Sequence, residues 1–291
     1  MAVEGGYSSS QIDDLCFHPS VSSASLEALR PPPLRAKPLP LRSRLEDVVE
    51  VEIAPRLVLL HNDYLALPPD RRPSRNDIET LAKLAIGADE AAAVAHFESI
   101  RAQEHSLPTL LTFFLAPAAE HLGELWSQDL CDFFEVTLGV GRLQALMDRL
   151  GFSEVAPRAD SRRRAVMIAP PGETHNFGLR MVAGLLEATR WRVTVEEGRP
   201  AEENARTVAE EWIGVVGVTV SVVSRLELAA RTIAAVRSAS INPHLGVMVG
   251  GSAFSEHPEF VAQVGADGAG FDAPTATVLA SHLLTRQPRR R

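Results

Sequence analysis

Hydrophobic residues recur with two different periods along the chain, and the change of period divides it into two predicted domains. In residues 76–155 the spacing is that of amphipathic helices, as in NDIETLAKLAIGAD, where Ile78, Leu81 and Leu84 fall on one face behind an Asn-Asp N-cap. Three more segments have helical spacing: DEAAAVAHFESIRAQE, LPTLLTFFLAPAAEHLGELWSQD and DFFEVTLGVGRLQALMDRLGF. Helical segments joined by short connections predict a helical-bundle cap domain.

In residues 160–287 short apolar runs alternate with helical segments. The apolar runs are RRAVMIAPP, RVTVEE, IGVVGVTVSV, LGVMVGGSA and GAGFD, and each precedes a helical segment. A run such as RRAVMIAPP is typical of a parallel strand that is buried on both faces. Repeated strand–helix units predict an α/β domain with a Rossmann-like (flavodoxin-like), doubly wound parallel sheet.

Three segments fall outside the two predicted domains. Residues 1–45 are rich in Ser and Pro and predict a disordered arm, since proline denies a helix its hydrogen bonds. This arm is either a solvated linker or a docking segment for an acidic partner, because it carries a basic patch of Arg30, Arg35, Lys37, Arg42 and Arg44. Residues 46–75 form a connecting segment whose secondary structure stays open, and residues 288–291 form a basic tail.

Charge and cysteine content narrow the class of protein. The formal net charge of −8 argues against broad binding to nucleic acid, which needs a basic surface. The chain has 2 cysteines, Cys16 and Cys131, too few for a disulfide scaffold and consistent with a reducing cytosol. No signal-peptide pattern opens the sequence and no apolar run has the length of a membrane span. We therefore expect a soluble cytoplasmic protein without a membrane partner, with Cys131 as a buried free thiol.

The most distinctive candidate for chemistry is His175, in the stretch APPGETHNFGLRM that connects the first predicted strand to its helix. Ligands of doubly wound sheets bind at the carboxyl ends of the strands, where this loop lies. Glu173 is placed to bind one ring nitrogen and leave the other free for a metal, and Gly178 leaves room for a bulky ligand. The loop lacks the glycine and lysine patterns of nucleotide sites. The alternative is a histidine with only a structural role in the turn.

Two further predicted strand ends carry small residues. Thr219 and Ser221 follow the third strand, and Gly250 and Gly251 follow the fourth. Each pattern is common in turns when taken alone. Because the carboxyl ends of parallel strands meet at one edge of a sheet, together with His175 they predict a single site.

These residues resemble the motifs of cobalamin (B12)-binding domains. ETHNFG resembles the DxHxxG motif with Glu173 in place of aspartate, TVS stands where the family often has SxL, and VGG matches its glycine pair. The upstream HLGELWSQDLCDFFEVT, which contains Trp126, resembles the family's helical cap. The pattern from Trp126 to FFEVT is most similar to the AerR/PpaA antirepressors of purple photosynthetic bacteria.

The resemblance implies a cofactor and a role for each candidate residue. The cofactor is cobalamin, as adenosyl- or hydroxocobalamin, with His175 as the lower axial ligand of cobalt and the nucleotide tail in a slot beside the sheet. Trp126 covers the upper face or, alternatively, belongs to the bundle core. FEVT replaces the Glu-His that photoreceptor and methyltransferase caps carry, so an upper axial histidine is absent there. Four other histidines stay unranked as candidates for that face: His61, His96, His105 and His121.

The resemblance also implies a function, beside which two alternatives stay open. We expect a light-responsive regulator, not an enzyme, that relieves a transcriptional repressor of photosynthesis genes through protein contact. Direct DNA binding is not expected, since no helix-turn-helix precedes the cap. The first alternative is the corrinoid-carrier subunit of a methyltransferase or mutase, although the chain has no room for a catalytic barrel. The second is a haem-binding redox sensor, because imidazole ligates iron as readily as cobalt.

Overall fold

The structure is a computed structural model that describes residues 72–150 and 161–287. The predicted arm of residues 1–45, nearly all of the connecting segment 46–75 and the tail 288–291 lie outside the described residues, as does His61. Among the described helices none is long and apolar enough to cross a membrane.

The first described part of the chain is helical, as the spacing of its apolar residues predicted. Its elements are α4 (Arg75–Ile86), α5 (Glu90–Arg101), α6 (Leu107–Leu110), the π-helix η5 (Leu111–Leu115), α7 (Ala116–Ser127) and α8 (Phe133–Asp148). The predicted Asn-Asp cap of the first helix is wrong. Ser74 is the N-cap, because its hydroxyl accepts the Asp77 N–H while the Asp77 carboxylate accepts the Ser74 N–H in a capping box.

One predicted helix is divided into three consecutive pieces. The segment from Leu107 to Ser127 runs through α6, η5 and α7. Pro117 has no N–H to donate to the carbonyl four residues before it, which removes one α-helical hydrogen bond. The Ala116 N–H instead bonds the Leu111 carbonyl, five residues back, so the helix widens locally into a π-turn.

The helical region has its own apolar core. Leu81, Phe97, Phe114 and Leu143 are fully buried in one cluster, and the rings of Phe97 and Phe114 stack with centroids 6.1 Å apart. Burial of each such side chain contributes roughly 1.5–3 kcal/mol. Met181 and Leu185 of the later helix α9 are buried in the same cluster, so α9 shares this core.

The second part confirms the predicted fold class, a parallel α/β sheet. Its strands are β1 (Arg164–Ala169), β2 (Arg192–Glu197), β3 (Val215–Thr219), β4 (Gly246–Gly250) and β5 (Gly268–Ala269), in the spatial order β2-β1-β3-β4-β5. Every pairing between them is parallel. The connecting elements are α9 (Phe177–Ala188), α10 (Ala201–Glu210), the 3-10 turn η7 (Val223–Arg225), α11 (Leu226–Ala239), α12 (Ser252–Glu256), α13 (Phe260–Gln263) and α14 (Ala273–Thr285).

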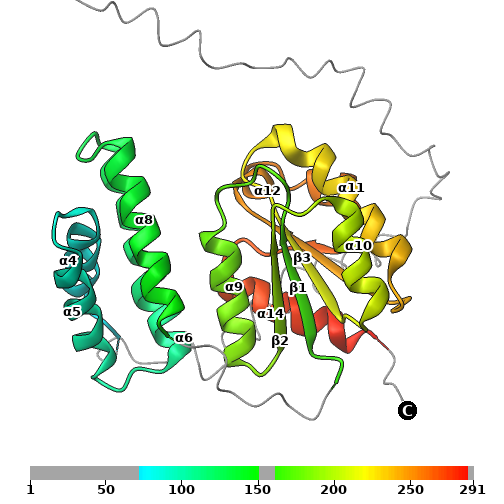
Figure 1. Cartoon of the computed structure of the whole chain (residues 1–291), viewed down its shortest axis with the longest axis horizontal. Coiled ribbons are helices and arrows are strands. Elements are labelled where there is room, and N and C mark those ends of the chain that lie inside the picture. The colour runs from blue at the N-terminus through cyan, green and yellow to red at the C-terminus, as the bar shows by residue number, and fades with distance from the viewer. Residues whose placement is uncertain (1–71, 151–160, 288–291) are drawn as a thin grey trace, which may run out of the picture. The chain divides into compact units, whose positions relative to one another are not determined.

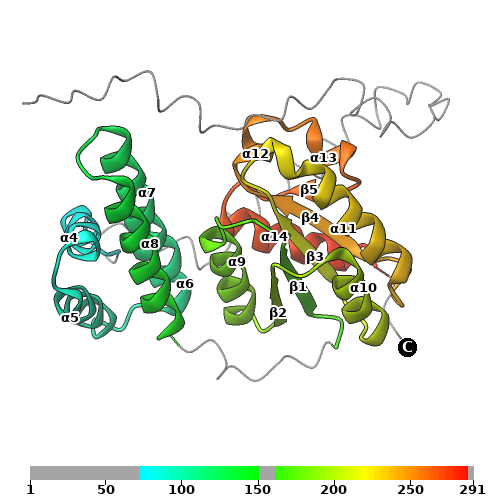
Figure 2. The same ribbon diagram turned by 45° about the horizontal axis from the view of Figure 1, so that its top comes forward.

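Helices cover both faces of this sheet. α9 and α14 lie on one face and α10 and α11 on the other (Figure 1; Figure 2). Along β1, Val166 and Ile168 enter the core beneath α10 and α11, whereas Met167 enters the core beneath α9 and α14. This alternation explains why the central strands read as continuous apolar runs. β2 lies at the sheet edge and is largely exposed, as its charged sequence RVTVEE reflects.

Two predicted elements are shorter than their sequence patterns suggested. The fifth strand, expected over GAGFD, pairs only through Gly268 and Ala269. The fourth connecting helix, expected over HPEFVAQVG, is the single turn α13, which follows the separate short helix α12. Local sequence patterns define the ends of helices and strands less well than their existence.

Candidate functional site

The strand order creates a crevice where the sequence places its candidate residues. β1 and β3 are neighbours, but the helices that follow them, α9 and α11, lie on opposite faces of the sheet. The loops after these two strands therefore diverge at a topological switch point, the usual ligand site of such sheets. Glu173 and His175 lie in the first loop and Ser221 lies in the second.

A buried carboxylate joins the two loops. The Glu173 side chain has no exposed surface, and its Oε1 accepts the Ser221 hydroxyl at 2.6 Å and the His175 backbone N–H at 2.9 Å. Its Oε2 accepts the Ser221 backbone N–H at 2.8 Å. A buried carboxylate is tolerated only when hydrogen bonds or charges compensate for its lost hydration. Glu173 therefore fixes the position of both loops.

The same network orients the His175 imidazole. Its Nδ1 lies 3.3 Å from Glu173 Oε1 and 3.1 Å from the Ser221 hydroxyl oxygen. Because the Ser221 hydroxyl donates its hydrogen to Glu173, its oxygen can accept a hydrogen bond from Nδ1–H of His175. The proton thus belongs on Nδ1, and the lone pair of Nε2 stays available on a side chain that is 73% exposed. This is the arrangement of a metal-binding imidazole held by a carboxylate.

The electrostatics of Glu173 involve one residue that sequence reasoning missed. Arg225, at the end of η7, places its Nη1 3.8 Å from Glu173 Oε2. Burial raises the pKa of Glu173, but the hydrogen bonds from Ser221 and His175, together with the Arg225 charge, outweigh it and lower the pKa below its ordinary value. The carboxylate is therefore ionised at neutral pH. No local motif around Arg225 marks this contact, which depends on the pairing of β1 with β3.

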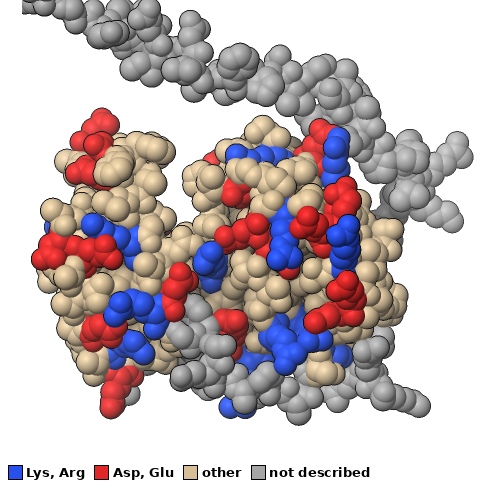
Figure 3. Space-filling view, viewed as in Figure 1, with Lys and Arg blue, Asp and Glu red and all other residues tan. Residues whose placement is uncertain are grey.

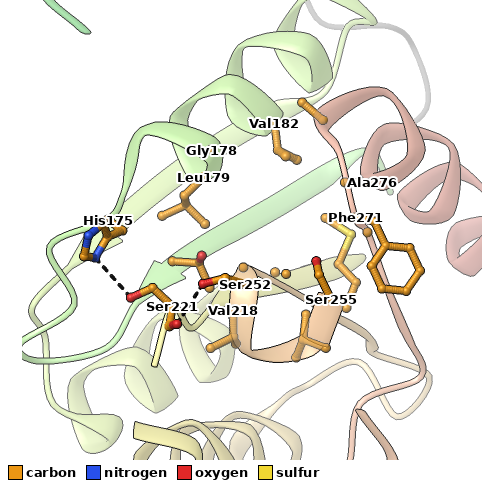
Figure 4. A pocket seen from close by; sticks show the side chains of 18 of the residues that line it. His175, Gly178, Leu179, Val182, Val218, Ser221, Ser252, Ser255, Phe271 and Ala276 are labelled. Atoms are coloured by element: carbon orange, nitrogen blue, oxygen red, sulfur yellow. Dashed lines mark hydrogen bonds between the residues drawn. The ribbon is translucent and has the colours of Figure 1, made fainter. Parts of the chain in front are cut away.

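A cavity of about 450 Å³ opens beside this network. It extends from His175 and Ser221 at one end to Phe271 and Ala276 at the other, between α9 and the carboxyl ends of the strands (Figure 4). Its size lies within the usual range for small-molecule and cofactor sites. Most of the predicted site residues line the cavity: His175, Gly178, Thr219, Ser221, Gly250 and Gly251.

Gly178, Gly217 and Gly251 line this cavity. A β-carbon on Gly217 of β3 would lie 2.6 Å from the Met167 methyl carbon, so the absent side chain leaves space for the two methionines, Met167 and Met248, that line the cavity. Gly251 has a φ of +103°, and a β-carbon there would lie 2.2 Å from the Val220 carbonyl oxygen. Only glycine fits that position without strain. Within the part of the chain that the structure describes, a β-carbon on Gly178 would meet nothing within 4 Å.

The helical region brings other predicted residues to its surface. Trp126 is 52% exposed, so the interpretation of Trp126 as bundle core is wrong, whereas its role over a cofactor stays a prediction. Trp126 belongs to a set of exposed large apolar side chains in and between α7 and α8 that also contains Leu130, Phe133 and Phe134.

The histidines of the helical region have local partners in two cases. His96 Nε2 lies 3.0 Å from the Asp77 carbonyl oxygen, and His121 Nδ1 lies 3.0 Å from a Glu124 carboxylate oxygen. His105 Nε2 is buried and has no hydrogen-bond partner among the described residues. Cys131 is a buried free thiol, as predicted, and burial raises its pKa.

Comparison with known proteins finds a family model that matches this part of the chain. Residues 163–279 match the model of the B12 binding domain. Over 173 residues the chain is 27% identical to the "uncharacterized 20.5 kDa protein in bchF-crtJ intergenic region" of Rhodobacter capsulatus, a match that covers 59% of this chain and 90% of that protein.

A solved structure has a similar fold. The monomethylamine corrinoid protein of Methanosarcina barkeri aligns with a TM-score of 0.58 and 14% sequence identity, covering 73% of this chain and 99% of its own. This likeness extends beyond the matched domain into the preceding helical region. At this level of identity it shows the fold alone.

The donor set fits a metal that brings its own equatorial ligands. Within residues 72–150 and 161–287 no three His, Cys, Asp or Glu side chains gather as a protein-only metal site would require. A single exposed imidazole beside a large cavity instead suits a tetrapyrrole-type metal, whose ring occupies the other positions. The site therefore fits the cofactor after which the domain family is named.

Proposed function

We propose that this chain binds cobalamin with His175 as the lower axial ligand of cobalt and with the nucleotide tail in the 450 Å³ cavity. The observation that carries the proposal is the Glu173–His175–Ser221 network. It favours the tautomer with the proton on Nδ1 and so leaves the Nε2 lone pair available, on a side chain that is 73% exposed at one end of that cavity. Gly178, Thr219, Gly250 and Gly251 line the path of the tail.

The residues of the chain then have separate tasks. Glu173 fixes the tautomer of His175 and, through its charge, makes the imidazole a stronger donor. Ser221 fixes Glu173 by two hydrogen bonds from the neighbouring loop. Trp126 would cover the face of the corrin away from His175 and would exclude water from it. Adenosylcobalamin supplies a light-sensitive cobalt–carbon bond when it is bound.

We further propose that the bound state regulates transcription through a protein partner, a repressor of photosynthesis genes. The support is the AerR/PpaA-like sequence of the helical region and the relative whose name places it between bchF and crtJ. Contact with a protein also suits the exposed apolar residues Leu130, Phe133 and Phe134. Positive and negative side chains are interleaved on the face in Figure 3, which does not favour direct DNA binding.

A corrinoid-carrier subunit is the second candidate function, and the B12-binding domain itself favours it. In that case the chain would present methylcobalamin to a separate catalytic subunit. A carrier transfers the methyl group to an acceptor when the catalytic partner is added. A regulator instead changes the fraction of operator DNA that is occupied by the repressor.

The experiment is a titration of the purified full chain, in the dark, with adenosylcobalamin and separately with haemin. We expect one equivalent of corrinoid to be retained after gel filtration, with an absorption spectrum of the base-off, His-on form. Retention of haemin with no retention of corrinoid would contradict the proposal and favour the haem sensor.

The regulatory step has its own assay. The dark and illuminated forms of the loaded protein are added to the repressor on its operator DNA, and DNA occupancy is measured. We expect occupancy to fall with one of the two forms and not with the other. Equal occupancy with both forms, combined with methyl transfer to an acceptor, would support the carrier instead.

A further inference from the structure

Among the residues that the structure describes, Arg225 is the charged residue near Glu173 that the proposed function leaves without a task. We propose that Arg225 is a positioning residue whose charge competes with His175 for the Glu173 carboxylate and thereby weakens the bond from His175 to cobalt. The inference rests on the proposed function, because it concerns the strength of that bond. It predicts that removing the Arg225 charge strengthens axial ligation.

The geometry separates the two competitors. His175 approaches Glu173 through Oε1, where Nδ1 lies at 3.3 Å and the backbone N–H at 2.9 Å. Arg225 approaches through Oε2, where Nη1 lies at 3.8 Å. The two residues therefore face different oxygens of one carboxylate. Electron density drawn toward Oε2 is withdrawn from the oxygen that polarises the imidazole.

Arg225 is not needed to hold the carboxylate in place. Glu173 already accepts three hydrogen bonds of 2.6–2.9 Å from Ser221 and the His175 backbone. The 3.8 Å separation to Arg225 is too long for a hydrogen bond. What Arg225 adds is its charge, which acts strongly because the Glu173 side chain is fully buried and the Arg225 side chain is only 29% exposed.

Two backbone turns fix the position of the Arg225 side chain. Arg225 ends the η7 turn, where its backbone N–H bonds the Val222 carbonyl at 3.0 Å. Its guanidinium lies against Gly172, the residue before Glu173, with Nε 3.5 Å from the position of a β-carbon there. The arginine thus spans from the loop after β3 to the loop after β1. Its place depends on backbone turns on both sides and not on a solvated side chain.

The strength of the His175 bond is measurable by displacement with cyanide. The full chain is loaded with cyanocobalamin and titrated with potassium cyanide at constant pH, following the absorption of the dicyano form. In this exchange the bond from cobalt to the His175 nitrogen breaks and a second cobalt–carbon bond forms, with no change in oxidation state. The midpoint concentration reports the strength of the axial bond.

The expected result is a higher midpoint for Arg225→Gln, by roughly threefold to tenfold, since partners one step beyond a metal ligand change its affinity by about that much or more. Arg225→Lys keeps the charge and should stay within about twofold of the parent. Arg231→Gln is the matched control, because this arginine pairs with Glu227 on α11. If Arg225→Gln does not fold by circular dichroism, Arg225→Met replaces it.

The outcomes separate the inference from the function on which it rests. A lower or unchanged midpoint in Arg225→Gln, or a shift in Arg225→Lys of the same size as in Arg225→Gln, overturns the charge competition. A parent protein whose midpoint equals that of His175→Ala, or that retains no cyanocobalamin, overturns the proposed ligation itself. A midpoint that is raised in Arg225→Gln and not in Arg225→Lys supports both the charge competition and the proposed ligation.

Discussion

The cavity beside His175 can be partly filled without disturbing the fold, through Gly178→Leu. A β-carbon at Gly178 meets no atom of residues 72–150 or 161–287 within 4 Å, so the new side chain enters open space and not the core. Gly178 lies within α9, where a residue with a side chain also favours the helix by roughly 0.5–1 kcal/mol. We therefore expect the variant to unfold at a temperature equal to or above that of the parent.

The effect on binding follows from the volumes. A leucine side chain fills on the order of 100 Å³, a substantial share of the cavity of about 450 Å³. If the nucleotide tail occupies this cavity, the leucine and the tail compete for the same space. We expect cobalamin affinity to fall at least about tenfold, equivalent to roughly 1.4 kcal/mol.

The assay is equilibrium dialysis with cobalamin, compared among the parent, Gly178→Ala and Gly178→Leu. The methyl group of Gly178→Ala is small, so its affinity should stay within about threefold of the parent. A folded Gly178→Leu variant with the affinity of the parent would refute the reasoning, because the cavity would then not receive the ligand.

Three other substitutions test separate parts of the account. Trp126→Ala should leave the melting temperature nearly unchanged, because the indole is 52% exposed. It should speed the photolysis of the cobalt–carbon bond, measured by absorption; an unchanged rate would show that Trp126 does not cover the cofactor. Gly251→Ala should destabilise the protein by about 2–4 kcal/mol in urea unfolding, because φ is +103° and the β-carbon meets the Val220 carbonyl; a value below about 0.5 kcal/mol would contradict the strain. Burial raises the pKa of Glu187, so the protein loses stability as pH rises from the pKa of the unfolded chain toward that of the folded one. Glu187→Gln should therefore raise the melting temperature slightly at pH 7 and not at pH 3, and a decrease at pH 7 would contradict this sign.

The sequence predicted the elements whose chemistry is local. The helical spacing of residues such as Leu81 predicted a helix, and the apolar run of β1 predicted a buried strand, because burial on one or two faces imposes those periods directly. Element ends were less predictable. The Ser74 cap and the π-turn before Pro117 depend on single backbone hydrogen bonds, which periodicity does not record.

The candidate site divides in the same way. Glu173, His175 and Ser221 were predicted together because the ends of parallel strands must meet at one edge of the sheet. The direct contact between His175 Nδ1 and Glu173 Oε1 is long, at 3.3 Å. Arg225 was missed because its contact with Glu173 joins residues far apart in sequence. Such pairs follow from strand register and side-chain direction, which no local motif encodes.

The central claim is that the His175 nitrogen is bonded to cobalt. The most direct measurement is the electron paramagnetic resonance spectrum of the cobalt(II) form, made by anaerobic photolysis of the adenosylcobalamin-loaded chain, with histidine labelled with nitrogen-15. We predict that each cobalt line splits into a triplet in unlabelled protein and into a doublet in labelled protein, and that His175→Ala abolishes the label-dependent change. A triplet that persists in the labelled protein would show that the cofactor's own base remains bonded to cobalt, and would contradict the account.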